Sequence, residues 1–190
     1  MDSLKQIKEW LNTFVPFNEQ ERVDCLRIKQ FLEEEQNLLL RENIKMHFTA
    51  SAWVLNPAKD KVLMLYHNIY QSWSWSGGHA DGEGNLLSVA IKEVKEESGL
   101  TSLKPLLASP LSVEILGVQP HYRKQQYVSA HLHLNYTFLL HNTEEEKLKI
   151  CPEENSRVSW ISPDKAVEAS TESWMKPVYE KLNEKMRKYL

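Results

Sequence analysis

The 190-residue chain has little cysteine and no excess of positive charge, and these absences exclude several classes of protein. Its two cysteines, Cys25 and Cys151, are too few for a disulfide scaffold or for a zinc site made of four thiolates. A formal net charge of −3 provides no positive field to hold a polyanion, so we expect no nucleic-acid partner. The scarcity of cysteine also favours a reducing compartment, and we predict a cytoplasmic protein.

Long apolar runs are missing as well. The chain never reaches the roughly 18 consecutive apolar residues that indicate a membrane-spanning helix, and its first residues lack the apolar segment of a secretory signal. We therefore expect no membrane association. A content of 42% hydrophobic and 26% charged residues is typical of a globular protein, and the length corresponds to about one domain with an extension.

The N-terminal region has helical periodicity. Apolar residues recur three or four positions apart until Pro16 ends the pattern: Leu4, Ile7, Leu11 and Phe14. Asn18 and Glu21 have the spacing of a capping box, which predicts the start of a second helix. We predict a helical extension over residues 1–44 and a main domain over residues 45–190. Packing of the extension on the domain is the simpler interpretation, and a partner or homodimer interface is the alternative.

From His47 onward the apolar period changes to two, which indicates β-strands. Strands are predicted from 47 to 54, 61 to 66, 111 to 115 and 127 to 140. In the last of these, apolar residues alternate with a polar set that includes His131 and His133. A closing helix is predicted from residues spaced four apart: Trp174, Val178, Leu182 and Met186. Strands with helices before, between and after them favour a layered α/β or α+β domain.

The segment from Gly77 to Leu100 combines a glycine-containing loop with an acidic helix. Asn85 can cap this helix, and Gly99 can end it in the left-handed conformation. Three carboxylates then lie together on one helix face: Glu93, Glu96 and Glu97. Their repulsion would be reversed by a hard divalent cation such as Mg²⁺ or Mn²⁺. Acidic helix faces are more often merely solvated, so the spacing to the glycine loop decides between the two interpretations.

That spacing resembles the signature of the Nudix hydrolase family, G-x5-E-x7-R-E-U-x-E-E-x-G-U, in which U is aliphatic. Seven positions agree in register: Gly78, Glu93, Val94, Glu96, Glu97, Gly99 and Leu100. Two positions depart, because Gly84 replaces the first glutamate and Lys92 replaces the arginine. The resemblance implies an α/β/α sandwich with a mixed sheet. It also implies Mg²⁺- or Mn²⁺-dependent hydrolysis of a pyrophosphate bond in a nucleoside diphosphate derivative or a related small organic pyrophosphate.

By position, the resemblance assigns the metal ligands to Glu93, Glu96, Glu97 and the carbonyl of Gly78. Glu93 is the first candidate for the general base, with Lys92 to orient it, while Glu153 or Glu154 could supply the base from a later loop. Lysine keeps the positive charge but loses the planar fork of arginine. The alternative is therefore a weak or inactive Nudix-fold module that binds a nucleotide and regulates, unless Asp81 or Glu83 compensates from the loop.

Other residues are candidates for substrate contact. His79 follows Gly78 and could touch a phosphate or the leaving group. Trp75 could stack on a base, or could simply belong to the core. We interpret His131 and His133 as a substrate-contacting pair rather than a zinc site, because no third ligand lies near them in the sequence. Residues typical of the Nudix subfamilies that cleave ADP-ribose, dinucleoside polyphosphates or coenzyme A are absent, so the substrate stays open.

Overall fold

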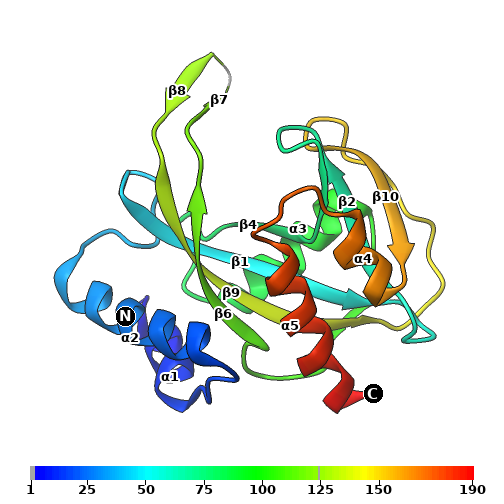
Figure 1. Ribbon diagram of the computed structural model, residues 1–190, viewed down its shortest axis with the longest axis horizontal. Helices are drawn as coiled ribbons and strands as arrows, with labels where there is room; N and C mark the ends of the chain where they lie inside the picture. The colour runs from blue at the N-terminus through cyan, green and yellow to red at the C-terminus, as the bar shows by residue number, and fades with distance from the viewer. Residues whose placement is uncertain (1–2, 124) are drawn as a thin grey trace.

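A curved β-sheet with helices on both faces forms the centre of the computed structural model, which describes residues 3–123 and 125–190 (Figure 1). The helices are α1 (Lys5–Thr13), α2 (Glu19–Glu34), α3 (Leu86–Ser98), α4 (Pro163–Ala169), α5 (Lys176–Met186) and the short 3-10 helix η1 (Arg187–Tyr189). The strands are β1 (Met46–Leu55), β2 (Val62–His67), β3 (Ser72–Ser74), β4 (Ser76–His79), β5 (Leu103–Pro105), β6 (Ser112–Val118), β7 (His121–Arg123), β8 (Gln126–Val128), β9 (His131–Asn142) and β10 (Asn155–Ile161).

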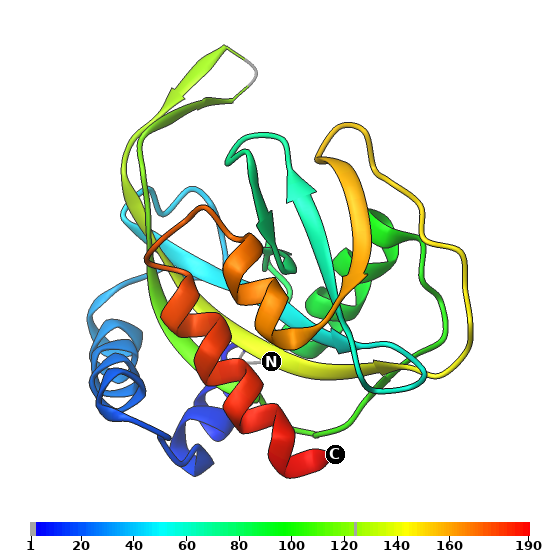
Figure 2. The same cartoon turned by 45° about the vertical axis from the view of Figure 1, so that its right-hand side comes forward.

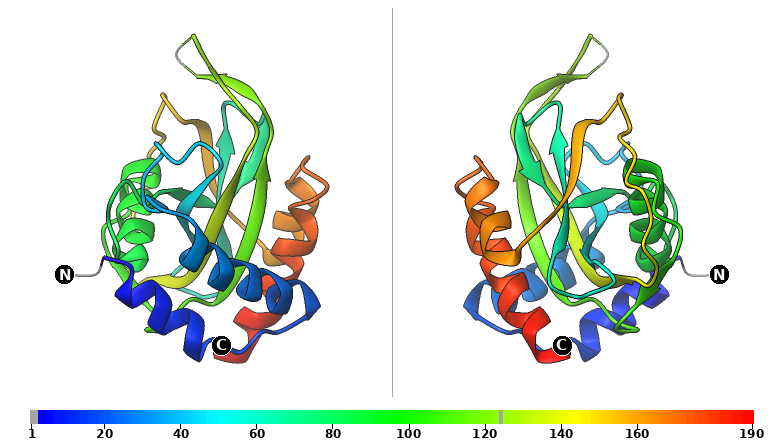
Figure 3. Two further views of the ribbon diagram at one scale, coloured as in Figure 1. Left: turned by 90° about the vertical axis from the view of Figure 1, so that its left-hand side faces the viewer. Right: turned by 90° about the vertical axis from the view of Figure 1, so that its right-hand side faces the viewer.

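The sheet is mixed, with the order β10-β2-β1-β9-β5. Strand β1 runs parallel to β9 and antiparallel to β2 and β4, while β3 pairs with β2 and β6 with β9. Seen edge-on, α3 lies on one face and α4 and α5 lie on the other (Figure 3). The expected α/β/α arrangement with a mixed sheet is confirmed.

Strand β1 is buried along its whole length because both of its faces carry a core. Phe48 and Ala50 belong to the cluster that includes Val94 of α3. Residues of the opposite parity point the other way, and Trp53 stacks on Tyr179 of α5 with ring centroids 5.4 Å apart. Each sheet face is thereby sealed by its own helices, and α4 and α5 lie together on the second face (Figure 2).

The N-terminal helices cover the edge of the sheet. The predicted helix start at Asn18 is confirmed, because Asn18 Oδ1 accepts from the Glu21 backbone N–H at 3.0 Å. The Glu21 side chain reaches back to the Phe17 N–H at 2.7 Å, one residue before the cap. Asp24 Oδ2 of α2 accepts from the Ile115 N–H of β6 at 2.9 Å. This contact satisfies a backbone group that an edge strand would otherwise expose.

A buried ion cluster, which the sequence analysis does not predict, joins α2, β6 and α5. Lys181 Nζ lies 2.9 Å from Glu114 Oε1, and Lys185 Nζ lies 2.6 Å from Glu21 Oε1. Burial acts to raise the pKa of Glu21, but Lys181, Lys185 and a hydrogen bond from Ser112 outweigh it, so the pKa is lowered. The cluster therefore ties the first helices of the chain to the last.

Two sequence predictions are corrected. The strand predicted from 127 to 140 is divided, because β8 pairs with β7 in a separate hairpin that projects from the sheet (Figure 1) and β9 begins at His131. The residues of β8 are largely exposed, so their alternation does not mark a core. Trp174 does not belong to the closing helix: it is 58% exposed, and α5 starts at Lys176 with Pro177 in its first turn, where proline is favoured. In the described part of the chain, no helix has the length and apolar character needed to cross a membrane.

Candidate active site

Helix α3 is positioned by the caps that the sequence predicts. Asn85 Oδ1 accepts from the Ser88 N–H at 3.2 Å, and Gly99 ends the helix with a φ of +75°. The apolar residues Ala90 and Val94 bury one stripe of α3 against the sheet. This packing turns Glu93 and Glu97 towards β4.

Strand β4 accommodates Glu93 and Glu97 because it places only small residues opposite them. A Cβ atom on Gly78 would lie 2.3 Å from Cδ of Glu93, so only glycine lets this carboxylate rest against the strand. Two residues earlier on the same face, Ser76 Oγ donates a hydrogen bond to Glu97 Oε2. Glu97 is only 3% exposed, which makes it a deeply buried carboxylate.

A third carboxylate, Glu154, reaches the same place from the loop before β10. The pKa of Glu97 is raised to about 8, first by burial and then by the charges of Glu154 and Glu93 and a side-chain hydrogen bond with Glu154, against the bond from Ser76. Asn155 holds the loop in place, since its Nδ2 donates to the Glu97 carbonyl at 3.0 Å. Asn155 is a positioning residue that sequence reasoning missed, because its partner lies 58 positions away.

The remaining acidic candidates are more exposed. Burial raises the pKa of Glu93, and Glu96 and Glu154 act in the same direction while Lys92 opposes them. Lys92 itself is 65% exposed and lies 3.9 Å from Glu93 and 3.4 Å from Glu96. Glu96 therefore stands at the rim, paired with Lys92, and Glu153 and Glu154 are both exposed. Glu93, Glu97 and Glu154 act on one another's charge, and we call these three residues the carboxylate cluster.

The loop between β4 and α3 is engaged in structural contacts. Asp81 accepts from Arg41 Nε at 2.7 Å, and Glu83 Oε1 accepts from the Asn85 N–H at 2.7 Å. At Gly84, a Cβ atom would lie 1.9 Å from the carbonyl oxygen of Ser3. The departure from the signature at Gly84 thus has a local cause, because the N-terminal segment occupies the space of a side chain.

Arg41 is a further residue that the sequence did not indicate. The hydrogen bond to Asp81 raises the pKa of Arg41, and the charges of Glu93 and Glu154 contribute. The pKa of His47 is lowered first by burial, and the charge of Arg41 acts in the same direction. The guanidinium of Arg41 is thus close enough to affect both the carboxylates and the histidines. Its planar set of donors is also suited to binding a phosphate group.

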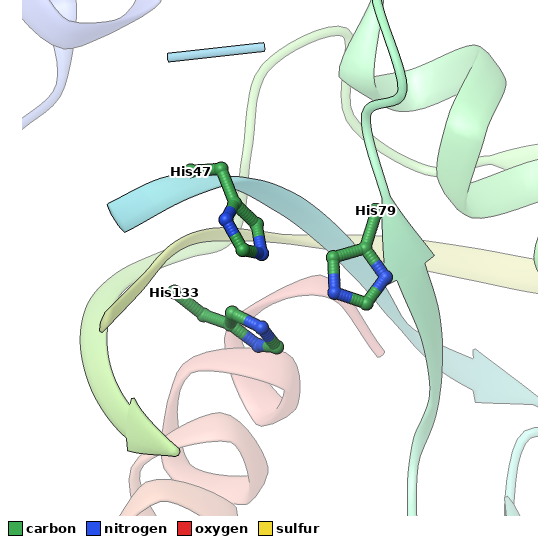
Figure 4. A group of neighbouring side chains, drawn as sticks. All are labelled: His47, His79 and His133. Carbon is green, nitrogen blue, oxygen red and sulfur yellow. The ribbon is translucent and has the colours of Figure 1, made fainter. Parts of the chain in front are cut away.

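The structure brings His79, His131 and His133 together and adds His47, which sequence reasoning missed. Figure 4 shows three of the four rings, those of His47, His79 and His133. These four residues are the histidine cluster. Strand pairing explains the gathering, since His47 lies opposite His133 and Thr49 lies opposite His79. Their ring centroids are 4.9 to 5.1 Å apart in the contacting pairs.

The histidine cluster lies on the sheet face opposite to the carboxylate cluster. Gly78 faces Glu93, whereas Gly77 faces Ser51 on the side of β1 that also carries His47, and His79 shares the parity of Gly77. Burial, followed by the neighbouring histidines, lowers the pKa of His133 to about 2, so its ring is neutral.

Trp75, the remaining candidate for substrate contact, is half-buried. Its ring meets the ring of Tyr179 edge-on, with centroids 5.5 Å apart.

The family model of the NUDIX domain matches residues 45–182. The chain therefore belongs to the Nudix hydrolase family. Among curated proteins, it is 28% identical over 145 residues to a probable DHNTP pyrophosphohydrolase of Lactococcus lactis subsp. cremoris, covering 76% of this chain and 81% of that protein.

Solved structures share the fold. A C. elegans Ap4A hydrolase in a binary complex is 16% identical, with a TM-score of 0.53 and coverage of 74% of this chain and 97% of that one. The Nudix hydrolase RenU of M. smegmatis is 13% identical, with a TM-score of 0.55 and coverage of 75% and 86%.

Proposed function

We propose that this protein is a Mg²⁺- or Mn²⁺-dependent pyrophosphohydrolase acting on a nucleoside diphosphate derivative or a related small organic pyrophosphate. The observation that carries the proposal is the convergence of Glu93, Glu97 and Glu154 beside Gly78. Family membership supports hydrolysis of a pyrophosphate bond, and the name of the Lactococcus relative points to the same chemistry.

The carboxylate cluster fits a hard divalent cation. A buried carboxyl group beside other carboxylates resists ionisation, and for this reason the pKa of Glu97 is raised. A cation held by oxygen ligands would remove it, and carboxylates select Mg²⁺ or Mn²⁺ over softer metals. We assign Glu93 and Glu97 as ligands with Glu154 beside them, Glu96 at the exposed rim, and the Gly78 carbonyl as a further oxygen.

The chain's own residues then have distinct roles. When bound, the cation supplies charge neutralisation to the pyrophosphate and lowers the pKa of water. Glu93 stays the first candidate for the general base, and Glu154 is the alternative because it lies at the same cluster. Lys92 opposes the raised pKa of Glu93, and Arg41 provides a planar cation for a phosphate.

The test is turnover of a panel of nucleoside triphosphates, ADP-ribose, nucleotide sugars, dinucleoside polyphosphates and pterin triphosphates, with Mg²⁺, Mn²⁺ or chelator. Glu97→Gln is the test variant, and Glu180→Gln, on the exposed side of α5, is the matched control. We expect metal-dependent turnover of one substrate class that is lost in Glu97→Gln and kept in Glu180→Gln. Equal activity in both variants would contradict the proposal.

A second candidate, a nucleotide-binding module without turnover, is favoured by one observation. Lys92 is exposed and makes only a long contact to Glu93, so it cannot hold that carboxylate as a planar guanidinium would. Isothermal titration of the same compounds separates the candidates, because binding of a nucleotide with Mg²⁺ and no turnover would establish the module.

A further inference from the structure

The histidine cluster has the donor set of a transition-metal site. One ring nitrogen from each of His47, His79 and His133 lies within 4.8 Å of the other two, and Figure 4 shows the three rings turned towards one another. They come from β1, β4 and β9, so paired strands hold their backbones in place. Three imidazoles with one further position is a recurrent arrangement for zinc in proteins.

Hydrogen bonding fixes the tautomer of two of the rings. His47 Nδ1 lies 3.1 Å from the Asn43 carbonyl, which can only accept, so Nδ1 carries the proton and Nε2 carries a lone pair. His131 repeats the pattern, since its Nδ1 lies 2.9 Å from the Ser129 carbonyl. A backbone carbonyl on the outer ring nitrogen is how proteins orient histidines that bind a metal through the other nitrogen.

The inner nitrogen of His47 supplies an independent observation. The residue is 5% exposed, and its Nε2 is buried with no hydrogen-bond partner among the described residues. Leaving such an atom unsatisfied destabilises the fold, and a metal ion in the cluster would satisfy it.

His131 stands directly beside the three rings. Its Nε2, which carries a lone pair, accepts a hydrogen bond from Nε2 of His133 at 3.2 Å. In a tetrahedral site with metal–nitrogen bonds of about 2.0–2.1 Å, ligand nitrogens are separated by roughly 3.3 Å. A metal ion could therefore take the place of the proton shared by this pair with little movement of either ring.

We propose that His47, His79 and His133 bind a transition-metal ion of the Zn²⁺ class, with His131 adjoining the fourth position. This site is separate from the carboxylate cluster in both place and chemistry. Imidazole nitrogen suits Zn²⁺, Co²⁺ or Ni²⁺, whereas Mg²⁺ requires oxygen. The proposal does not rest on the hydrolytic function, because it concerns binding alone.

The test measures binding of Zn²⁺ and Co²⁺ to the full chain in the presence of excess Mg²⁺, by calorimetry and by the visible spectrum of Co²⁺. We expect one equivalent of Zn²⁺ to bind, and Co²⁺ to show the absorption of a low-coordinate nitrogen site. His47→Gln and His133→Gln should weaken Zn²⁺ binding by more than about 100-fold, the upper end of the loss caused by removing a residue outside the ligand shell. His131→Gln should weaken it less.

Two controls make the result decisive. His141→Gln changes a histidine of the same strand β9 that bonds the Pro57 carbonyl instead, and it should leave Zn²⁺ affinity unchanged. Glu97→Gln removes a carboxylate on the other face and should also leave it unchanged. If His47→Gln fails to fold, His79→Gln provides the test, because that residue is half-exposed. Absence of Zn²⁺ binding, or binding lost in Glu97→Gln but kept in the histidine variants, would overturn the proposal and leave the cluster as a set of hydrogen-bonding side chains.

Discussion

The two polar clusters of this protein lie on opposite faces of one strand, and they differ in how they are built. The carboxylate cluster draws Glu93 and Glu97 from neighbouring turns of α3, and only Glu154 comes from elsewhere. The histidine cluster has no local pair apart from His131 and His133, and β1 and β4 supply the rest. Successive residues of β4 point to opposite faces, so Gly78 lies beside the oxygen donors and His79 lies among the nitrogen donors.

One sheet can thus present two kinds of ligand on its opposite faces without mixing them. Oxygen donors repel one another and are stabilised by a hard cation, whereas neutral imidazoles tolerate close approach before any ion binds. Arg41 lies near both groups and affects the pKa of His47 as well as responding to Glu93. The two clusters are thus adjacent in space and distinct in chemistry.

The largest expected effect is that substitutions in the two clusters remove different properties of the protein. Glu97→Gln should reduce metal-dependent turnover by at least about 100-fold, because a bound cation contributes several kcal/mol to such reactions. The same variant should retain its Zn²⁺ affinity, and His47→Gln should show the reverse. Steady-state kinetics and Zn²⁺ calorimetry on both variants check this, and parallel losses in one variant would show that the clusters act as one site.

A smaller loss is expected when the support of the carboxylate cluster is removed. Asn155→Ala deletes the hydrogen bond to the Glu97 carbonyl and should lower turnover by about 10- to 100-fold through misplacement of Glu154. If Asn155 acts by positioning, the Mg²⁺ concentration for half-maximal rate should rise as well. A change in thermal stability with normal kinetics would mean that Asn155 serves only the fold.

The pH dependence of stability provides a third contrast. The folded-state pKa of Glu97 is raised from 4.5 to about 8, so the folded protein binds more protons than the unfolded chain between these values. The contribution of this group to stability is therefore full below about pH 4.5 and is lost as the pH rises towards 8. In chelator, Glu97→Gln should flatten this decline in the melting temperature, and Mg²⁺ should stabilise the wild type most at high pH. An unchanged pH profile in the variant would contradict the assignment.

The smallest effect is expected at Lys92. An exposed ion pair is worth at most about 1 kcal/mol, so Lys92→Arg should raise turnover by no more than roughly fivefold. Gly84→Glu is a different change, because a side chain there meets the Ser3 carbonyl and displaces the N-terminal segment. Kinetics of the two single variants separate them, and a gain from Gly84→Glu alone would contradict this interpretation.

Local patterns made the fold and half of the candidate site predictable. The caps at Asn18, Asn85 and Gly99 and the spacing of Glu93 and Glu97 are all set by residues within one helix or its ends. The division of the strand at His131 was not predictable, because alternation continues through the exposed hairpin. The position of Trp174 was missed because the four-residue apolar spacing extends towards the N-terminus beyond Lys176. The helix itself begins at Lys176, with Pro177 in its first turn.

The rest depends on pairings between distant segments. His47 joins His133 only through the register of two parallel strands, and Lys185 meets Glu21 only when α5 packs against α2. No periodicity within either segment carries that information. For the same reason, the sequence alone favoured a substrate-contacting histidine pair, since the additional histidines lie on other strands.

We propose that one sheet carries an oxygen site and a nitrogen site that select different ions. The most direct measurement is a crystal structure grown with both Mn²⁺ and Zn²⁺, with anomalous scattering recorded at the absorption edge of each metal. We predict Mn²⁺ among Glu93, Glu97 and Glu154, and Zn²⁺ among His47, His79 and His133. Both ions on the carboxylates, or no ion on the histidines, would contradict the account.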